Sequence, residues 1–344
     1  MGKVLDYKCP ACDAVLKFNP HGQNWKCEYC RNEYNLEDLK SQEISLKTED
    51  KEQTELNNYN CPNCGASIVT LLNTSTTTCP YCRNTTIIKE KLSGEFNPDY
   101  LIPFKYNKDD AIEYFKRFHK RKILMPKEFN SIKNINEITG VYIPFWLYDI
   151  KANGNISATC NRVTTYSDAN YIYTKTDVYE AVRSGNFIFN KVPVDGATRF
   201  DDSIMNSIEP FDYKDLKDFS YSYLSGFLAD RYDVEKNKAY LIAKDRVEKS
   251  VVNNLKKDIM GYNSVIVNGK NISSDNIDSK YCLLPVWMLN IKYKDKIYPF
   301  AMNGQTGKMV GDYPVDIKKA IILGTLVFIV CILISILLFF IGVI

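Results

Sequence analysis

The longest hydrophobic pattern of the chain covers residues 320–344. This segment has no charged side chain, and its polar ones are Thr325, Ser335 and the weakly polar Cys331. A helix of 25 residues reaches about 37 Å, enough to cross a hydrocarbon layer about 30 Å thick. The alternative is a buried core helix, which would be expected to have a polar face. The pattern predicts a transmembrane tail anchor at 320–344, after a juxtamembrane linker at 313–319.

The residues around this segment predict its orientation. Lys318 and Lys319 precede it directly, and positive flanks stay on the cytoplasmic side. Residues 1–13 contain no apolar run that would form a signal peptide, and Asp6 does not fit a myristoylation signal. We expect a single-pass protein of the cell membrane, with its N-terminus and the bulk of the chain in the cytoplasm.

Hydrophobic positions between residues 93 and 312 alternate between the strand period and the helix period. A short strand at 100–102 precedes a helix from 107 to about 124, with one apolar face formed by Ala111, Ile112, Phe115 and Phe118. Residues 141–150 are apolar on both faces, which is typical of a central strand. Residues 155–194 alternate and are rich in Thr, Tyr, Val and Ile, which predicts a meander of two or three antiparallel strands.

Part of this pattern occurs twice. Ile143-Pro144-Phe145-Trp146 is matched by Leu284-Pro285-Val286-Trp287, and Tyr100–Ile102 upstream of the first is matched by Tyr240–Ile242 upstream of the second. After the second copy of the short strand, a helix is indicated by Val247, Val251, Leu255 and Ile259, ending at Gly261. We interpret this as a duplicated strand–helix–strand α/β body with halves at 93–236 and 237–312.

Three further segments complete the prediction for the body. Residues 223–232 are predicted to be helical, and 281–293 with 297–302 to form a hairpin. The run from Gly304 to Lys308 is a turn rather than a phosphate loop, because Met309 replaces the Ser or Thr that would hold Mg²⁺. Acidic residues between Asp201 and Asp233 show no pairing in their spacing and are interpreted as solvated loop residues. Since no known catalytic motif is present, we predict that the chain is not an enzyme.

Cysteine spacing predicts metal binding near the N-terminus. Two C-x2-C pairs are separated by 14 residues, and the same arrangement recurs 52 residues later. Four thiolates in this arrangement surround a tetrahedral Zn²⁺ and leave no open position. Disulfides or a redox C-x-x-C would not explain the duplicated spacing. We predict two structural zinc ribbons, at 1–34 and 59–92, around a polar linker at 35–58 with a helical turn at 36–39; the ligands are Cys9, Cys12, Cys27, Cys30, Cys61, Cys64, Cys79 and Cys82.

Charge helps to choose among the functions of such ribbons. The whole chain has a formal net charge of +3, but residues 1–95 carry 11 Lys and Arg side chains against 13 Asp and Glu. Two Zn²⁺ ions with eight thiolates bring this part to about −6, whereas surfaces that follow phosphates are usually basic. Trp25 and Tyr29 could stack on bases or could shield the metal. Protein binding or an architectural role is therefore favoured over nucleic-acid binding.

These residues together resemble a bacterial family of membrane proteins described as TFIIB-type zinc ribbons, and within it the YdjG-like type. Besides the cysteine pairs, the resemblance rests on segments 101–105 (LIPFK), 140–146 (GVYIPFW), 223–227 (YLSGF), 284–287 (LPVW) and 303–308 (NGQTGK). It covers nearly the whole chain. The resemblance implies a membrane protein encoded near phage-shock-protein A homologues, which helps to recruit the envelope-stress protein PspA through an adaptor.

The sequence thus predicts an α+β protein with two N-terminal four-cysteine zinc ribbons, a duplicated α/β body and one transmembrane helix. The main hypothesis is a tail-anchored, cytoplasm-facing scaffold or adaptor that docks partner proteins at the membrane. The first alternative is a membrane-tethered nucleic-acid-binding protein, and the second is an enzyme with an unrecognised site between Asp201 and Asp233. The sequence leaves the oligomeric state open.

Overall fold

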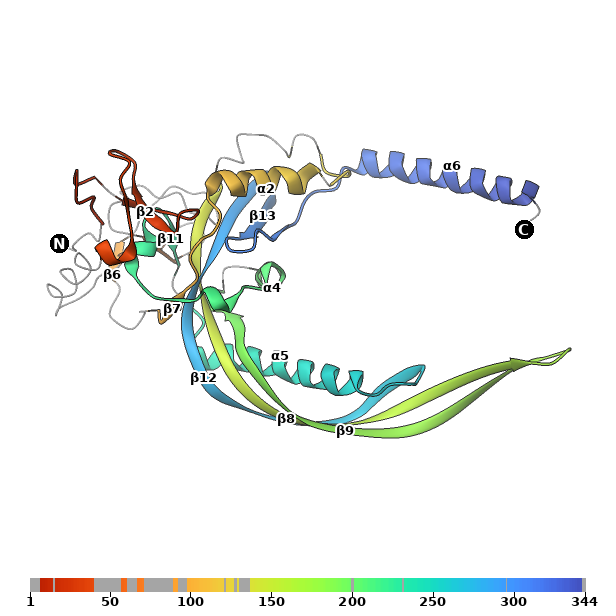
Figure 1. Cartoon of the computed structure of the whole chain (residues 1–344). Coiled ribbons are helices and arrows are strands. Elements are labelled where there is room, and N and C mark those ends of the chain that lie inside the picture. The colour runs from red at the N-terminus through yellow and green to blue at the C-terminus, as the bar shows by residue number, and fades with distance from the viewer. Residues whose placement is uncertain are drawn as a thin grey trace.

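The computed structural model of the chain describes residues 7–14, 16–39, 57–60, 67–70, 89–91, 98–120, 122–126, 129, 137–198, 201–230, 232–294 and 296–341. For 57–60, 67–70 and 89–91 only the backbone is described. The protein is α+β, with a small sheet near the N-terminus, a large mixed sheet with one strongly elongated region, and a C-terminal helix that projects from the body (Figure 1).

The N-terminal sheet is antiparallel, in the order β1 (Leu16–Asn19), β2 (Asn24–Cys27) and β3 (Glu33–Tyr34). Its alternate residues Leu16, Phe18, Trp25 and Cys27 are buried. Residues 36–39 are helical, as predicted from the sequence.

Three long strands form the centre of the large sheet, with β8 (Thr139–Ser167) between β9 (Ile172–Asp195) and β12 (Ser264–Tyr293). Val141–Leu147 of β8 is buried throughout, which confirms the prediction of a central strand. Beyond residue 150, β8 buries every second residue up to Cys160. These residues face α5 (Lys236–Lys257), which lies along the concave side of the curved strands (Figure 1).

The three strands continue past the body as a curved extension, which we call the arm: residues 151–167 of β8, 172–190 of β9 and 264–280 of β12 (Figure 1). Gly154 and Gly185 pair across it and let α5 approach closely. A Cβ atom on Gly154 would overlap Cγ1 of Val251, so α5 could not keep its place against a larger residue.

Shorter elements complete the body around these strands. β7 (Tyr100–Leu101) and β10 (Lys217–Asp218) continue the sheet beyond β12. The end of β12 and β13 (Lys296–Asn303) form the predicted hairpin, and β14 (Met309–Gly311) pairs with β13. On the other side, β11 (Leu228–Ala229) joins β8 to β5 (Ser67–Thr70), β4 (Asn57–Asn60) and β6 (Lys89–Lys91). The other α-helices of the body are α2 (Lys108–Lys120) and α4 (Asp202–Ile208).

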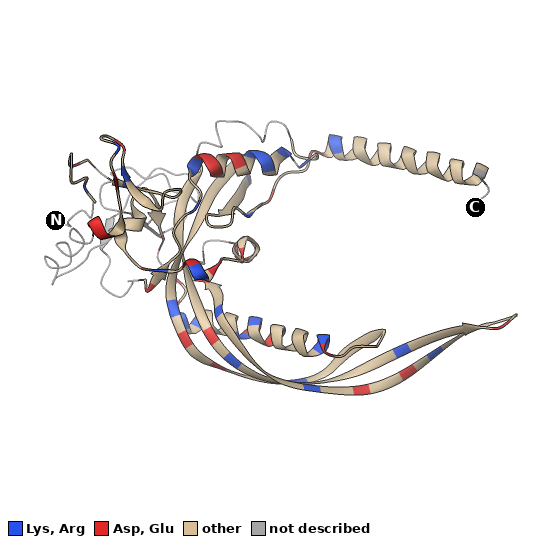
Figure 2. Ribbon diagram, in the orientation of Figure 1, with Lys and Arg blue, Asp and Glu red and all other residues tan. Residues whose placement is uncertain are grey.

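The last helix, α6 (Ile317–Ile341), is long and apolar enough to cross a membrane, and none of it is buried within the protein. Its charged residues lie only in the first turn (Figure 2). The body holds this turn by two hydrogen bonds: the Asp316 amide donates to the Leu124 carbonyl over 2.8 Å, and Lys319 Nζ donates to the Met125 carbonyl over 2.6 Å. The transmembrane prediction is supported in length and composition, and its sidedness stays a prediction.

Two predicted elements are wrong. Tyr240–Ile242 belongs to α5 and not to a strand, because Ala239 and Ala243 extend the four-residue spacing of the face that the helix buries. The described residues of 223–232 form no α-helix: a 3₁₀ turn at Tyr221–Leu224 is followed by Gly226, whose φ of +92° is left-handed, and then by β11. The two Pro-x-Trp segments do lie side by side, with Ile143 opposite Leu284, but the duplication itself stays a prediction.

Candidate metal centre

The first four predicted ligands come together in two similar turns. One turn contains Cys9 and Cys12, with the Asp13 amide donating to the Cys9 carbonyl over 2.8 Å; in the other, the Arg31 amide donates to the Cys27 carbonyl over 2.9 Å. Asp13 and Arg31 each follow the second cysteine of a pair and have φ values of 61° and 64°. A left-handed residue at this point ends each turn.

The four sulfur atoms are placed as a metal would require. Sγ of Cys9 lies 3.5 Å from Sγ of Cys30, Sγ of Cys12 lies 3.5 Å from Sγ of Cys27, and all four lie within 4.8 Å of one another. A tetrahedral Zn²⁺ with Zn–S bonds of about 2.3 Å separates its ligands by about 3.8 Å, which these distances approach. Cys9 and Cys27 are buried, while Cys12 and Cys30 are half-buried. The structure thus brings these four cysteines together at distances that suit one metal ion, and their role as zinc ligands stays a prediction.

The protonation of the thiols indicates why this cluster needs a cation. Burial acts to raise the pKa of Cys9, but hydrogen bonds outweigh it, first that with the Tyr34 hydroxyl at 3.2 Å, and lower the pKa to about 6. A backbone hydrogen bond from Asn32 lowers the pKa of Cys30, but burial and its contacts with the other three sulfurs raise it to about 12. Cys9 ionises more readily than Cys30, and a positive ion between the sulfur atoms would favour ionisation of all four thiols.

The second predicted set, Cys61, Cys64, Cys79 and Cys82, lies outside the described residues. The backbone around it is described in part: β4 ends at Asn60, directly before Cys61, and pairs with β5 and β6. Through the pairing of β5 with β11, this part of the chain is joined to the large sheet. A second zinc ion therefore stays a prediction.

The first ribbon is attached to the body by its aromatic side. The rings of Phe18, Trp25 and Tyr223 pack against one another with centroids 5.1–5.3 Å apart. Trp25, only 1% exposed, donates its indole N–H to the Ser222 carbonyl over 2.8 Å, and the Phe18 amide donates to the Ser225 carbonyl over 3.1 Å. Trp25 thus neither stacks on bases nor lies on the surface. Tyr29 is 83% exposed.

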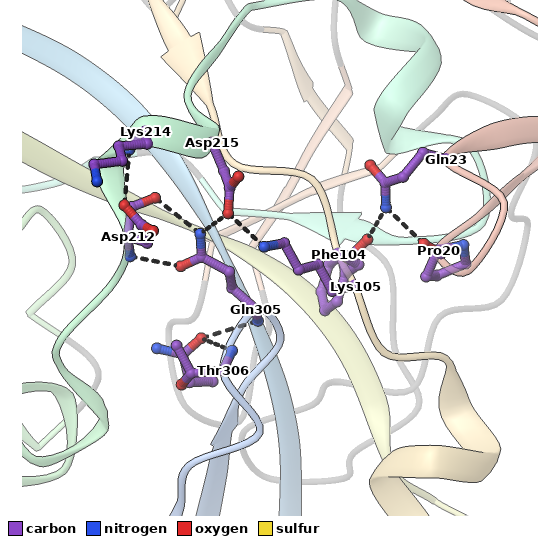
Figure 3. A network of polar contacts seen from close by, with 10 residues as sticks. Pro20, Gln23, Phe104, Lys105, Asp212, Lys214, Asp215, Gln305 and Thr306 are labelled. Carbon is purple, nitrogen blue, oxygen red and sulfur yellow. Dashed lines mark hydrogen bonds and ion pairs between the residues drawn. The ribbon is translucent and has the colours of Figure 1, made fainter.

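A polar network continues from this attachment into the body (Figure 3). Gln23 donates to the Phe104 carbonyl over 2.8 Å, Lys105 pairs with Asp215 at 2.6 Å, and the buried Gln305 amide donates to the carboxylate of Asp215 and accepts from the Asp212 amide over 2.8 Å. The hydrogen bond of Lys105, followed by that of Gln305, holds the pKa of Asp215 below its usual range. A cleft of about 540 Å³, bordered by His21, Lys105, Lys217 and Tyr223, lies at this junction.

The segment 303–308 is the centre of this network. Asn303 is fully buried; its side-chain amide donates to the Ile208 carbonyl over 3.0 Å, and its side-chain oxygen accepts from the amides of Gln305 and Thr306 at 2.9 and 3.0 Å. This confirms the prediction of a turn, here between β13 and β14. Its role as a connection was not predicted from the sequence, where the run of adjacent turn-forming polar residues was the available signal.

The acidic residues between Asp201 and Asp233 are used in local structure. Asp201 caps α4 by accepting from the Ser203 amide over 2.8 Å, Asp212 caps the next 3₁₀ turn through the Lys214 amide over 3.0 Å, and Asp233 accepts from both the amide and the hydroxyl of Thr198. Such capping satisfies the free amides at the start of a helix. These contacts give each of the three carboxylates a structural role.

Comparison with known proteins places these features in a family. No family model matches the chain, and no solved structure matches it. It is 36% identical over 316 residues to the uncharacterized protein YdjG of Bacillus subtilis (strain 168), an alignment that covers 92% of either protein. With this identity over nearly the full length of both proteins, the chain belongs to the YdjG family.

Proposed function

We propose that this protein is a membrane-anchored scaffold whose zinc ribbons and α/β body dock partner proteins at the cytoplasmic face of the membrane. The observation that carries the proposal is a continuous connection through the molecule. The first ribbon is fixed to the body through Trp25, and the body holds the first turn of α6 through Asp316 and Lys319. A bilayer that contained α6 would therefore hold the ribbon, through the body, at a defined position relative to the membrane.

The metal sites in this proposal are structural. Four cysteines occupy all the positions of a tetrahedral ion, which leaves no open position for a substrate or an activated water. By the repeat of the spacing, Cys61, Cys64, Cys79 and Cys82 would hold a second Zn²⁺. A ribbon of about 30 residues has too small a core to fold alone, so the metal supplies most of its folding free energy, on the order of 10 kcal/mol.

The partners follow from the family resemblance, and the orientation follows from Lys318 and Lys319. With these lysines on the cytoplasmic side, the ribbons and body face the cytoplasm, where an adaptor that recruits PspA in the envelope-stress response would bind. The nucleic-acid alternative loses one of its two stacking rings, because Trp25 is buried. A salt-dependent mobility shift of the purified chain with DNA or RNA would favour that alternative.

Proximity labelling in living cells tests the scaffold. The full chain fused to a labelling enzyme should mark a defined set of proteins that includes PspA or its adaptor. Cys9→Ser combined with Cys61→Ser should lose this set while the protein stays in the membrane fraction. A Tyr29→Ala variant, altered at an exposed ribbon residue, controls for expression. The same labelled set from the double variant and the wild type would contradict the proposal.

A further inference from the structure

The turn of the β8–β9 hairpin carries an exposed cluster of aromatic and aliphatic side chains. We call residues 163–174 the tip of the arm. Ile172 is 77% exposed and Tyr171 66% exposed, and Tyr166 and Tyr173 are also exposed. Tyr166 and Tyr173 face each other across the hairpin and stack, with ring centroids 5.3 Å apart and planes 16° apart. Among the described residues no other element packs on this cluster, so its apolar surface is not part of a core.

The tip is almost free of charge. Asp168 is its single charged residue, and that carboxylate accepts hydrogen bonds from the amides of Asn170 and Tyr171 at 2.9 and 2.8 Å and from the Tyr173 hydroxyl at 3.2 Å. Cationic side chains flank the tip at Arg162, which donates to the Gly261 carbonyl, and at Lys175, which pairs with Asp177 at 3.1 Å. Figure 2 shows this distribution: apart from the acidic position at the very end of the arm, the charged positions of the arm lie nearer to the body.

This combination matches the interfacial layer of a membrane. Tyrosine has an apolar ring and a polar hydroxyl and is enriched where hydrocarbon meets headgroups, and flanking cations suit anionic lipids. An exposed apolar cluster of this kind marks a surface that binds something. The arm and α6 leave the body toward the same side (Figure 1). A bilayer around α6 is therefore the large apolar phase nearest to the tip.

We propose that the tip inserts Tyr166, Tyr171, Ile172 and Tyr173 into the interfacial layer of the bilayer that contains α6, so that the protein contacts the membrane at two separate places. The inference rests on the membrane anchoring in the proposed function. In Figure 1 the arm runs beside α6, and its charged residues cannot lie within hydrocarbon. For the tip to reach the interfacial layer, the axis of α6 must be inclined to the arm in the membrane; α6 would turn about its start, where Asp316 and Lys319 hydrogen-bond to the body.

Tryptophan fluorescence tests this contact in the full chain. Trp25, Trp146 and Trp287 are 1%, 8% and 6% exposed, so lipid quenchers do not reach them and they give a constant background. The probe is Ile172→Trp, and the matched control is Ser184→Trp, at an exposed position in the middle of β9. Each variant is reconstituted into vesicles of phosphatidylcholine and phosphatidylglycerol, with and without brominated phosphatidylcholine.

The tryptophan introduced at position 172 should emit at shorter wavelength than the control and lose most of its intensity in brominated vesicles, while the control changes little. If the protein floats with the vesicles but the tryptophan at position 172 is water-exposed and unquenched, the tip does not contact the bilayer. That result would overturn the inference and leave the membrane anchoring by α6 intact. A blue-shifted but unquenched probe would mean that protein, either the same chain or a second copy, covers the tip, which overturns the lipid assignment. Failure of both variants and the wild type to float would remove the anchor and this inference with it.

Discussion

Replacing Trp25 should separate the first ribbon from the body without emptying its metal site. Trp25→Ala removes a fully packed indole, and such truncations cost about 3–5 kcal/mol. Part of this cost is the hydrogen bond to the Ser222 carbonyl; leaving that buried acceptor unpaired accounts for about 1–3 kcal/mol. Trp25→Phe keeps most of the contacts with Phe18 and Tyr223 and should cost about 1–3 kcal/mol. Tyr29→Ala, at an exposed site, should stay within about 0.5 kcal/mol.

Hydrogen exchange of the Phe18 amide measures this separation directly, because that amide donates to the Ser225 carbonyl across the junction. A loss of about 3 kcal/mol corresponds to exchange about 100-fold faster if the ribbon opens as a unit. Zinc content should stay at the wild-type value, since the four cysteines are unchanged. Wild-type exchange at Phe18 in the alanine variant would refute the reasoning, and loss of zinc would show that Trp25 supports the ribbon itself rather than its attachment.

Three further predictions concern the arm, helix α2 and the metal. Gly154→Ala places a methyl group well inside van der Waals contact with Val251 Cγ1 and should lower the free energy of unfolding in urea by about 1–3 kcal/mol, whereas Ser157→Ala on the opposite face of β8 should not. Burial lowers the pKa of His119, more than its hydrogen bond with the Phe115 carbonyl raises it; the unfolded chain therefore binds the proton more readily, and stability should fall as the pH drops below about 6.5. His119→Phe should flatten that part of the stability–pH curve, and an unchanged curve would assign the effect to other groups. Mass spectrometry of the purified protein should find two zinc ions per chain in the wild type and one in Cys9→Ser, and a single ion in the wild type would dismiss the second site.

Features that are determined by residues close together in the sequence could be predicted from it. The ligands of the first metal site were predictable because a C-x2-C turn and its 14-residue partner spacing already define where the sulfur atoms can meet. The apolar helix was predictable because the residues from Ala320 onward are all uncharged and nearly all apolar. In the same way, Ile143 to Trp146 reads as a central strand because both of its faces are apolar.

Features that depend on distant parts of the chain were not predictable. Residues 264–280 belong to a long strand, yet they are rich in Asn, Ser and Asp, because one face of the arm meets solvent and only the other meets α5. Similarly, nothing near Trp25 in the sequence indicates that its partner is Ser222, 197 positions away. The helical prediction for residues 223–232 failed because the turn at Gly226 and the pairing of β11 with β8 come from the tertiary fold.

One unbroken strand, β8, joins the outermost turn of the molecule to the segment beside β11, close to the ribbon. In mechanical terms it is a lever: a load on Ser167 is transmitted through 29 consecutive residues and through ladder hydrogen bonds on both sides, with no intervening loop to absorb it. Bending or stretching of the surface that holds the outer end would then reach Val141 and Tyr142 as strain.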